Sequence, residues 1–306
     1  MRIDRVMVID FNCAMPAKTF VLGEYSVTQD GRAIILLSEP CFEANFYADD
    51  DGGPRSLSPR SLSLRGVSPP IAKFINLHPK ELANKRCDFI DPYKGIGGFG
   101  ASSAEFLAWI KYYYFLCGIE FDLANPQHYQ QALEYFVACS SGGSGTAPSG
   151  ADMIAQNSNR LAFVNLPEKG LKTIAWPFAD LVLCLAHTKN KVATYLHLAR
   201  LKPGFEFTLL SENVAKFNNA VDSNSEDGVI QSINSSCAEL DRLGFLHPRS
   251  GAVINSALKH DFCLAAKGCG AMGSDVILFV FRPAMLEQAK SFINAEGLDL
   301  IYYFLG

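Results

Sequence analysis

The sequence predicts an α+β protein with two lobes. Its 306 residues exceed what one compact core usually holds, so two cores are expected. Hydrophobic residues make up 49% of the chain and charged residues 19%, which suits packed cores and excludes a disordered protein. Strand-like and helix-like segments follow each other in mixed order, which favours α+β lobes over a parallel doubly wound sheet. We expect the first lobe over residues 1–170 and the second over residues 171–306.

The chain from Val6 to Tyr47 predicts an antiparallel meander. Runs rich in β-forming residues are separated by turn signals such as "QDGR". The runs are "VMVIDF", "TFVLGEYSV", "AIILL" and "CFEANFY". Residues 49–70 are rich in Ser, Pro and Arg, and they predict an exposed loop.

The rest of the first lobe is predicted to be mainly helical. A short helix near Ile71 to Leu77 and a strand at "RCDFI" precede a glycine-rich stretch. Apolar residues then recur at helical spacing. The predicted helices are "SSAEFLAWIKYYYFLCG", "HYQQALEYFVACS" and, after a loop at "SGGSGTAPSG", "ADMIAQN".

The second lobe begins with two predicted strands, "LKTIAW" and "DLVLCLAHT". Helical stretches continue through Leu243 and lead to the glycine-rich segment "FCLAAKGCGAMGSDVILFVF". A last helix, "PAMLEQAKSFINA", precedes the strand "LDLIYYF".

Charge and cysteine usage limit the partners and the compartment. The net charge of -4 argues against a nucleic-acid partner, which normally selects a basic face. The nine cysteines contain no C-x-x-C pair and are interpreted as small buried side chains in a reducing cytosol. No segment reaches the roughly 20 uninterrupted apolar residues of a membrane span, and the first residues lack a signal-type core. We therefore expect a cytoplasmic protein without a membrane partner.

Residues 95–106, "GIGGFGASSAEF", form the most informative motif. Gly95, Gly97 and Gly100 match the dinucleotide pattern G-x-G-x-x-G, which requires a strand running directly into the first glycine and an acidic residue about 20 positions later. Glu120 meets the second requirement, but "DPYK" interrupts the strand. A phosphate loop at a helix N-terminus is the alternative, because glycines, free N–H groups and a serine hydroxyl suit phosphate and Mg²⁺.

One kind of phosphate loop can be excluded for this motif, and one simpler interpretation remains. The chain contains no G-K-[ST], which excludes an ordinary P-loop NTPase. A simple glycine turn, with Ser102 capping a helix, also accounts for these residues.

Several stretches resemble one kinase superfamily. "GFGASSA" resembles the "GLGSSA" loop of the galactokinase, homoserine kinase, mevalonate kinase and phosphomevalonate kinase superfamily, the GHMP kinases. "PAKTFVLGEYSV" resembles their N-terminal signature and "AKGCGAMGSD" their C-terminal glycine-rich signature, while "APSGAD" resembles the segment with the acidic catalytic residue. The resemblance implies a two-lobed fold with a ribosomal protein S5 domain 2-like N-terminal lobe and a ferredoxin-like C-terminal lobe.

The resemblance implies ATP and Mg²⁺ as cofactors. Phosphoryl transfer depends on N–H-rich loops, cations, a metal ligand and sometimes a base. Ser102 aligns with the serine that ligates Mg²⁺, with Ser103 as the alternative, and Glu134 is a candidate second ligand. The residues implied to bind ATP are Gly98, Gly100, Ala101, Ser102, Ser103, Gly270 and Gly273.

Asp152 and Lys18 are the predicted catalytic residues. Asp152 would otherwise be a first-turn acid favoured by the helix dipole, and Lys18 a solvated lysine between strands. In this superfamily the lysine lies near the acceptor and the aspartate, where it stabilises developing charge. The candidate substrate contacts are Glu24, Lys189, Lys191, Thr194 and Lys267.

Two stretches depart from the superfamily's patterns. Ala271 and Met272 replace glycines of the third motif, where their side chains would crowd a phosphate loop. "TKNKVAT" resembles the substrate loop "TGxxAST" but has Lys189 where glycine is usual; a helix start with solvated lysines is the alternative.

The acceptor is predicted to be phosphomevalonate, slightly ahead of mevalonate. "GEYSV", Lys267 and Asp275 favour phosphomevalonate kinases, whereas the short chain and "PSGAD" favour mevalonate kinases. A hydroxyl acceptor needs a general base, while a phosphate acceptor is already largely anionic near its second pKa of about 6 and needs cations. Those cations would come from Lys267, Lys189, Lys191 and Arg160.

Other functions remain as alternatives. Mevalonate diphosphate decarboxylase is third, because its usual acidic motif is not evident. A non-catalytic relative would bind a metabolite and use "PRSLSPRSLSLRG" to contact a partner protein. The predicted partner is a small-molecule substrate, and a homodimer is left open.

Overall fold

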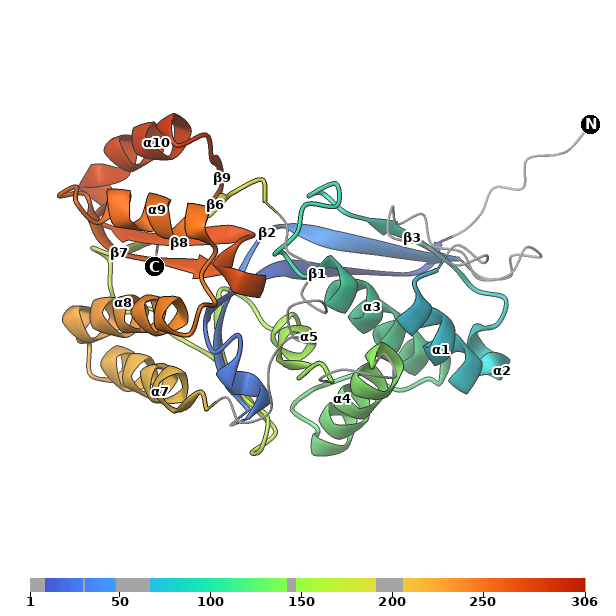
Figure 1. The fold of residues 1–306 in the computed structure, drawn as a ribbon. Helices are drawn as coiled ribbons and strands as arrows, with labels where there is room; N and C mark the ends of the chain where they lie inside the picture. The colour runs from blue at the N-terminus through green and yellow to red at the C-terminus, as the bar shows by residue number, and fades with distance from the viewer. Residues whose placement is uncertain (1–8, 30, 48–66, 142–146, 191–205, 306) are drawn as a thin grey trace, which may run out of the picture.

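The computed structural model describes residues 9–29, 31–47, 67–141, 147–190 and 206–305. Two antiparallel sheets, each with its own helices, form two lobes side by side (Figure 1). The predicted α+β class is confirmed. Most of the predicted loop over residues 49–70 lies outside the described residues, as do Lys191 and Thr194.

The first sheet has five strands. Its path runs β1-β2-β4-β5, and β3 pairs with the far half of β2. Residues 32–36 of β2 pair with β4, and residues 43–47 pair with β3. The strands are β1 (Ile9–Leu22), β2 (Arg32–Tyr47), β3 (Arg86–Ile90), β4 (Leu161–Asn165) and β5 (Gly170–Thr173).

The meander predicted from four short runs is wrong, because those runs join into the single long hairpin of β1 and β2. Pro16 does not end β1. It lies where the register shifts between Met15 and Ala17, on a strand at the end of the sheet path, where a missing N–H removes no ladder bond. The predicted strand through "GEYSV" instead turns after Leu22.

Helices cover one face of this sheet (Figure 1). The most deeply packed is α3, whose Trp109 and Tyr112 are fully buried. Tyr112 stacks on Phe46 of β2 with ring centroids 4.1 Å apart. The helices are α1 (Pro69–Leu77), α2 (Pro79–Leu82), α3 (Ala101–Leu116), α4 (Pro126–Ser140) and α5 (Ala151–Ala155).

The second sheet has the strand order β7-β8-β6-β9. A strand, helices, two strands, a helix and a last strand follow one another along the chain, which is the ferredoxin-like order. The strands are β6 (Val182–His187), β7 (Cys263–Cys269), β8 (Val276–Phe281) and β9 (Asp299–Leu305). The helices are α7 (Thr208–Asp222), α8 (Glu226–Arg242), α9 (Pro248–Ala257) and α10 (Leu286–Ala295).

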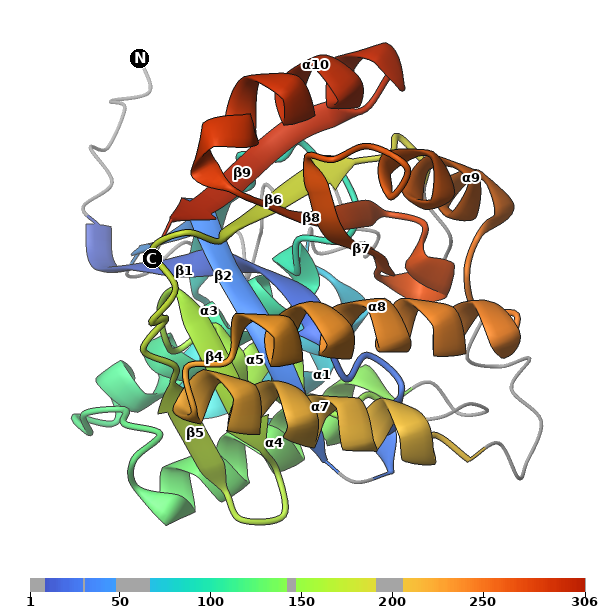
Figure 2. The ribbon, with the colours of Figure 1, turned by 90° about the vertical axis from the view of Figure 1, so that its left-hand side faces the viewer.

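Both faces of β8 are buried. Ile277 and Phe279 point into a cluster formed with α9 and α10, which lie on one side of the sheet (Figures 1 and 2). Val276 and Leu278 point to the opposite side and belong to the large core that also contains residues of β1, β2 and α3. A single hydrophobic core therefore runs from one lobe into the other.

A buried ion pair joins the lobes. Lys267 of β7 is fully buried, and its Nζ donates to the Glu24 carboxylate, beyond the end of β1, and to the carbonyl of Gly268 at 3.0 Å. Burial alone would lower the pKa of Lys267, but the Glu24 carboxylate that it contacts outweighs this effect and raises the pKa, so the lysine stays charged. In turn, burial raises the pKa of the Cys269 thiol to about 11.

Replacing Lys267 alone should destabilise the protein strongly. Lys267→Met leaves the Glu24 carboxylate buried without its cation, which typically costs about 3–5 kcal/mol. The double variant Glu24→Gln, Lys267→Met removes both charges and should recover part of that loss. Urea unfolding followed by circular dichroism measures both. A single variant as stable as the parent would contradict the role given to this pair.

Candidate active site

The glycine-rich stretch begins with a turn. β3 ends at Ile90, and the carboxylate of Asp91 accepts hydrogen bonds from the backbone N–H groups of Tyr93 and Gly95, both at 2.9 Å. No strand therefore runs directly into Gly95. The dinucleotide interpretation loses the strand-to-turn geometry on which it depends.

Gly98 and Gly100 are required by backbone conformation and by close contacts. Their φ angles are +92° and +80°, a region that side chains disfavour. A Cβ on Gly100 would lie 2.7 Å from Cγ of Lys18, and one on Gly98 would lie 3.0 Å from Cβ of Asp275. The loop therefore packs directly on the residues around it.

The two serines that follow have different environments. Ser103 is buried, and its hydroxyl donates to the carbonyl of Gly100 at 2.9 Å. Ser102 is exposed. The N-cap residue of α3 is Gly100, and no side-chain cap closes this helix start, which is the type of helix end that can bind a phosphate. Ser102 is therefore better placed than Ser103 to reach a metal ion.

Lys18 and Asp152 lie together beside this loop. The backbone N–H of Lys18 donates to the carbonyl of Phe99 at 3.0 Å, which fixes β1 against the glycine loop. The Nζ of Lys18 lies 3.8 Å from Oδ2 of Asp152, and the two side chains are 14% and 26% exposed. Both predicted catalytic residues are thus neighbours, and both remain accessible.

Asp152 is held in the first turn of α5. One of its carboxylate oxygens accepts from the N–H of Met153 at 3.0 Å. Gly150 precedes the helix with a φ of +77°, and a Cβ there would lie 2.4 Å from Leu133 of α4. This glycine lets the short helix approach α4 and aim its first turn at Lys18.

The third glycine motif packs against the first. Gly270 has a φ of +85°, and a Cβ there would lie 2.7 Å from Oδ2 of Asp275, the residue that also abuts Gly98. Met272 takes a left-handed conformation, with a φ of +55°. Its N–H donates to the Tyr25 hydroxyl at 2.9 Å, and its carbonyl accepts from the backbone N–H of His247 at 2.7 Å. The roles of Gly270 and Gly273 in binding ATP stay predictions.

The substrate role predicted for Lys267 and Glu24 does not fit their positions. The two side chains are buried against each other and so cannot present their charges to a ligand. Lys189 is exposed, and its Nζ lies 2.9 Å from Oδ1 of Asp299, on β9. Lys191 and Thr194 lie outside the described residues, so the substrate loop stays a prediction.

Glu134 lies on the solvent-facing side of α4. It is exposed on α4 and accepts a hydrogen bond from Gln130 at 2.6 Å. Ala132 and Phe136 form the buried side of this helix, and a position two residues away is turned by roughly 200° from each. The magnesium role of Glu134 stays a prediction.

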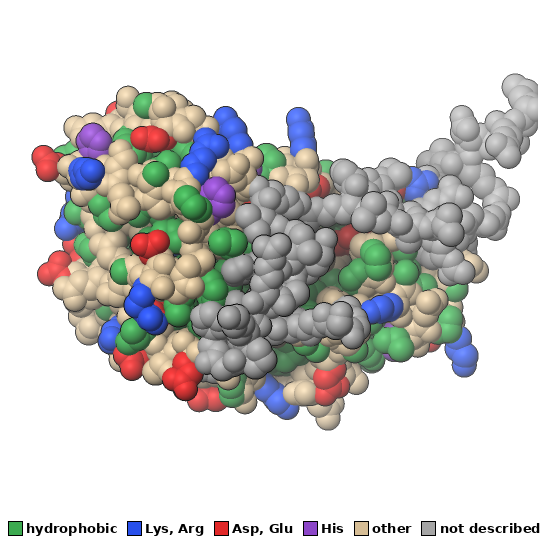
Figure 3. Space-filling model, viewed as in Figure 1, with side chains coloured by type: hydrophobic (Ala, Val, Ile, Leu, Met, Phe, Trp, Pro, Cys, Tyr) green, Lys and Arg blue, Asp and Glu red, His purple; other side chains and the backbone are tan. Residues whose placement is uncertain are grey.

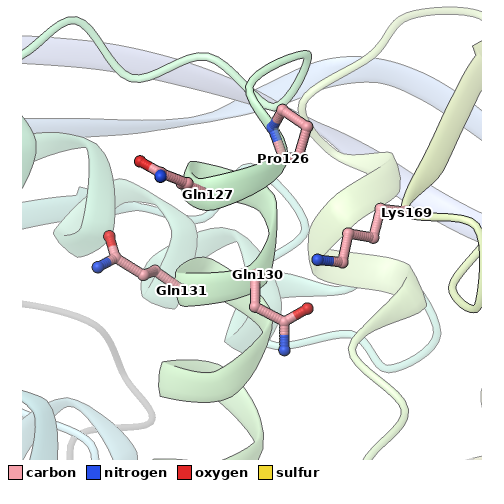
Figure 4. Close-up of a pocket in the computed structure, with 5 residues that line it drawn as sticks. All are labelled: Pro126, Gln127, Gln130, Gln131 and Lys169. Carbon is pink, nitrogen blue, oxygen red and sulfur yellow. The ribbon is translucent and has the colours of Figure 1, made fainter.

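The described surface has an open pocket between α4 and Lys169. Figure 4 shows its lining, which consists of Pro126, Gln127, Gln130, Gln131 and Lys169. None of these residues belongs to the Lys18, Asp152 and Ser102 cluster. On the face shown in Figure 3, described acidic and basic side chains are interspersed. No described helix combines the length and apolar character that crossing a membrane requires.

His187, at the end of β6, was not predicted from the sequence to lie near the glycine loop. It is buried, and its ring centroid lies 6.3 Å from that of Phe99 in the glycine loop. Its Nδ1 accepts the N–H of Lys189 at 3.1 Å. Burial lowers the pKa of His187, although the charge of Asp299 partly opposes this effect. A single histidine in an apolar run does not indicate, from the sequence alone, which segment it contacts.

Solved structures share this fold. The phosphomevalonate kinase of Streptococcus pneumoniae, in complex with phosphomevalonate and AMPPNP, superposes with a TM-score of 0.75 at 15% identity, over 96% of this chain and 99% of that one. The L. major mevalonate kinase in complex with R-mevalonate gives 0.69 at 14% identity, over 97% and 98%. The Methanococcus jannaschii mevalonate kinase gives 0.70 at 11% identity, over 97% and 98%.

These similarities confirm the two-lobed fold that the motifs implied, which the chain shares with these mevalonate and phosphomevalonate kinases. By sequence, no protein-family profile and no curated protein matches the chain.

The backbone conformation at Lys189 predicts that a glycine variant is more stable than an alanine variant, the opposite of the usual order. Its φ is +63°, in the region where glycine is favoured. Lys189→Gly and Lys189→Ala both remove the pair with Asp299, but only alanine keeps the steric conflict. We expect the glycine variant to be more stable than the alanine variant by about 1 kcal/mol. Thermal unfolding of the two variants tests this, and a more stable alanine variant would show that the conformation is not constrained.

His187 should make stability depend on pH. An unfolded histidine titrates near 6.5, whereas burial lowers its pKa in the folded state. The unfolded chain therefore binds the proton first, so the free energy of unfolding should fall as the pH drops below about 6.5. His187→Asn keeps an acceptor for Lys189 and removes the titration. Urea unfolding at pH 5 to 8 should show a smaller decline for this variant; identical declines would contradict the assignment.

Proposed function

We propose that this chain is an ATP-dependent kinase that transfers the γ-phosphoryl group of ATP to phosphomevalonate. The observation that carries the proposal is the juxtaposition of Lys18 and Asp152 beside an uncapped helix start preceded by positive-φ glycines. The shared fold with a phosphomevalonate kinase over nearly the whole chain supports it.

The helix start fits the phosphates of a nucleotide. A Cβ at Gly100 would clash with the Lys18 side chain, so only glycine lets the loop pack this closely beside that cation. The N–H groups of Ala101, Ser102 and Ser103 would hold phosphate oxygens, and the Ser102 hydroxyl would hold Mg²⁺ together with water and phosphate oxygens. The bound metal would neutralise charge on the transferred group.

Lys18 and Asp152 would act on the acceptor. Asp152 can accept a proton from an attacking hydroxyl, or orient an acceptor that has already lost it. Lys18 lies close enough to Asp152 to stabilise negative charge on the oxygen that attacks. Both side chains are partly exposed, so an acceptor can reach them.

Mevalonate is the second candidate. Of the cations expected to serve an anionic acceptor, Lys267 is buried on Glu24 and Lys189 pairs with Asp299. A partly exposed Asp152 beside a lysine also suits a neutral hydroxyl that must lose its proton. Phosphomevalonate stays first because of the sequence features shared with that branch.

Coupled ADP release tests the proposal and separates the two acceptors. The protein with ATP and Mg²⁺ should turn over phosphomevalonate, and mevalonate, homoserine and galactose complete the panel. Ser102→Ala should sharply lower kcat. Asp152→Asn should lower kcat by about 10²-fold or more with a hydroxyl acceptor. The same substitution should lower kcat much less with a phosphate acceptor, which is already largely anionic.

Asp222→Asn is the matched control, because Asp222 forms a comparable ion pair with Lys172, at 3.4 Å, on the exposed surface. It should leave kcat unchanged. No ADP release with any acceptor would reject the kinase proposal and favour a non-catalytic metabolite-binding relative. Turnover of mevalonate alone would replace phosphomevalonate as the acceptor.

A further inference from the structure

Gln156 connects the three segments that carry the candidate site. It follows directly after α5, one turn beyond Asp152, and its N–H donates to the Asp152 carbonyl at 3.1 Å. The side chain turns inward and is 1% exposed. Its Nε2 donates to the carbonyl of Pro16 at 2.8 Å and to the carbonyl of Gly100 at 3.2 Å.

Each of these contacts lies next to a predicted functional residue. Pro16 is two residues before Lys18 in β1. Gly100 is two residues before Ser102 and is the turn from which α3 begins. Both partners of Nε2 are carbonyl oxygens, so the amide must present its NH₂ group to them. One side chain thus fixes the spacing of β1, the glycine loop and α5.

The carbonyl of Gly100 is held by three donors. The N–H of Ala104 at 3.0 Å, the Ser103 hydroxyl at 2.9 Å and Nε2 of Gln156 all point to it. The first two belong to α3 itself and hold the loop only to its own helix. The Gln156 bond is the one that holds the loop to the element carrying Asp152.

We infer that Gln156 is a positioning residue that sets the distance between the phosphate loop and the Lys18–Asp152 pair; this rests on the proposed kinase function. It touches neither reacting group, and it acts through the two carbonyls. Misplacement of reacting groups by about 1 Å can cost 10²-fold in rate, so a lost bond at this junction should lower kcat far more than it changes KM for either substrate.

Gln156→Glu provides the test, because it keeps the shape and makes donation depend on pH. An ionised glutamate has no donor and would face two carbonyl oxygens, while the protonated acid can donate to one of them. Burial raises the pKa of such a carboxyl, so the protonated form gains weight within an accessible range. We expect kcat to be at least 10-fold below the parent at pH 8, and the ratio to the parent to recover as the pH falls toward 6.

Gln231→Glu, on the exposed side of α8, controls for the added charge and should show no pH-dependent deficit. Gln156→Met removes both donors without a charge, and its deficit in kcat should be the same at every pH. It also replaces Gln156→Glu if that variant does not fold. A purely structural role predicts lower thermal stability but normal kcat per folded molecule, and that result would overturn the inference.

The outcomes separate the inference from the function beneath it. Absence of ADP release by the parent protein would reject the kinase proposal, and the positioning role would fall with it. Turnover by the parent with unchanged kcat in folded Gln156→Glu and Gln156→Met would reject the positioning role alone.

Discussion

The buried pair of Lys267 and Glu24 is the constraint on which the arrangement of the lobes depends. Each charge is too costly to bury alone, so β7 and the end of β1 can pack only with both groups in contact. The Tyr25 hydroxyl, one residue further, receives the N–H of Met272. Lobe contact and the third glycine motif are therefore fixed by the same short segment, and Gly98 is brought against Asp275 as a result.

The candidate site lies on the first lobe, and each part reaches it by a separate route. β1 supplies Lys18, the loop before α3 supplies Ser102, and α5 supplies Asp152. Helix α5 is short and would not be stable alone, so its position depends on tertiary contacts at Gly150 and Gln156. The chemistry is accordingly positioned by packing rather than by a single rigid element.

Local patterns predicted much of this correctly. The strand at "RCDFI" and the long helix after the glycine loop follow from composition and spacing. The Lys18 and Asp152 neighbourhood came from motif resemblance. Burial was harder to predict. Lys267 belongs to a glycine motif, where a cation suggests a ligand contact. Its buried ion pair with Glu24, which is distant in sequence, is seen only in the structure. Gln156 gave no signal, because its partners are backbone carbonyls remote in sequence.

The two-sided burial of β8 has a consequence for how the chain folds. Val276, Leu278 and Val280 belong to a core that combines residues of β1, β2 and α3 with residues of α7 and α8. If the chain were cut between the lobes, the side chains of this shared core that pack across the boundary would be exposed on both fragments as apolar surface prone to aggregation. The two lobes should therefore gain and lose their structure as one cooperative unit, and neither should be soluble when expressed alone.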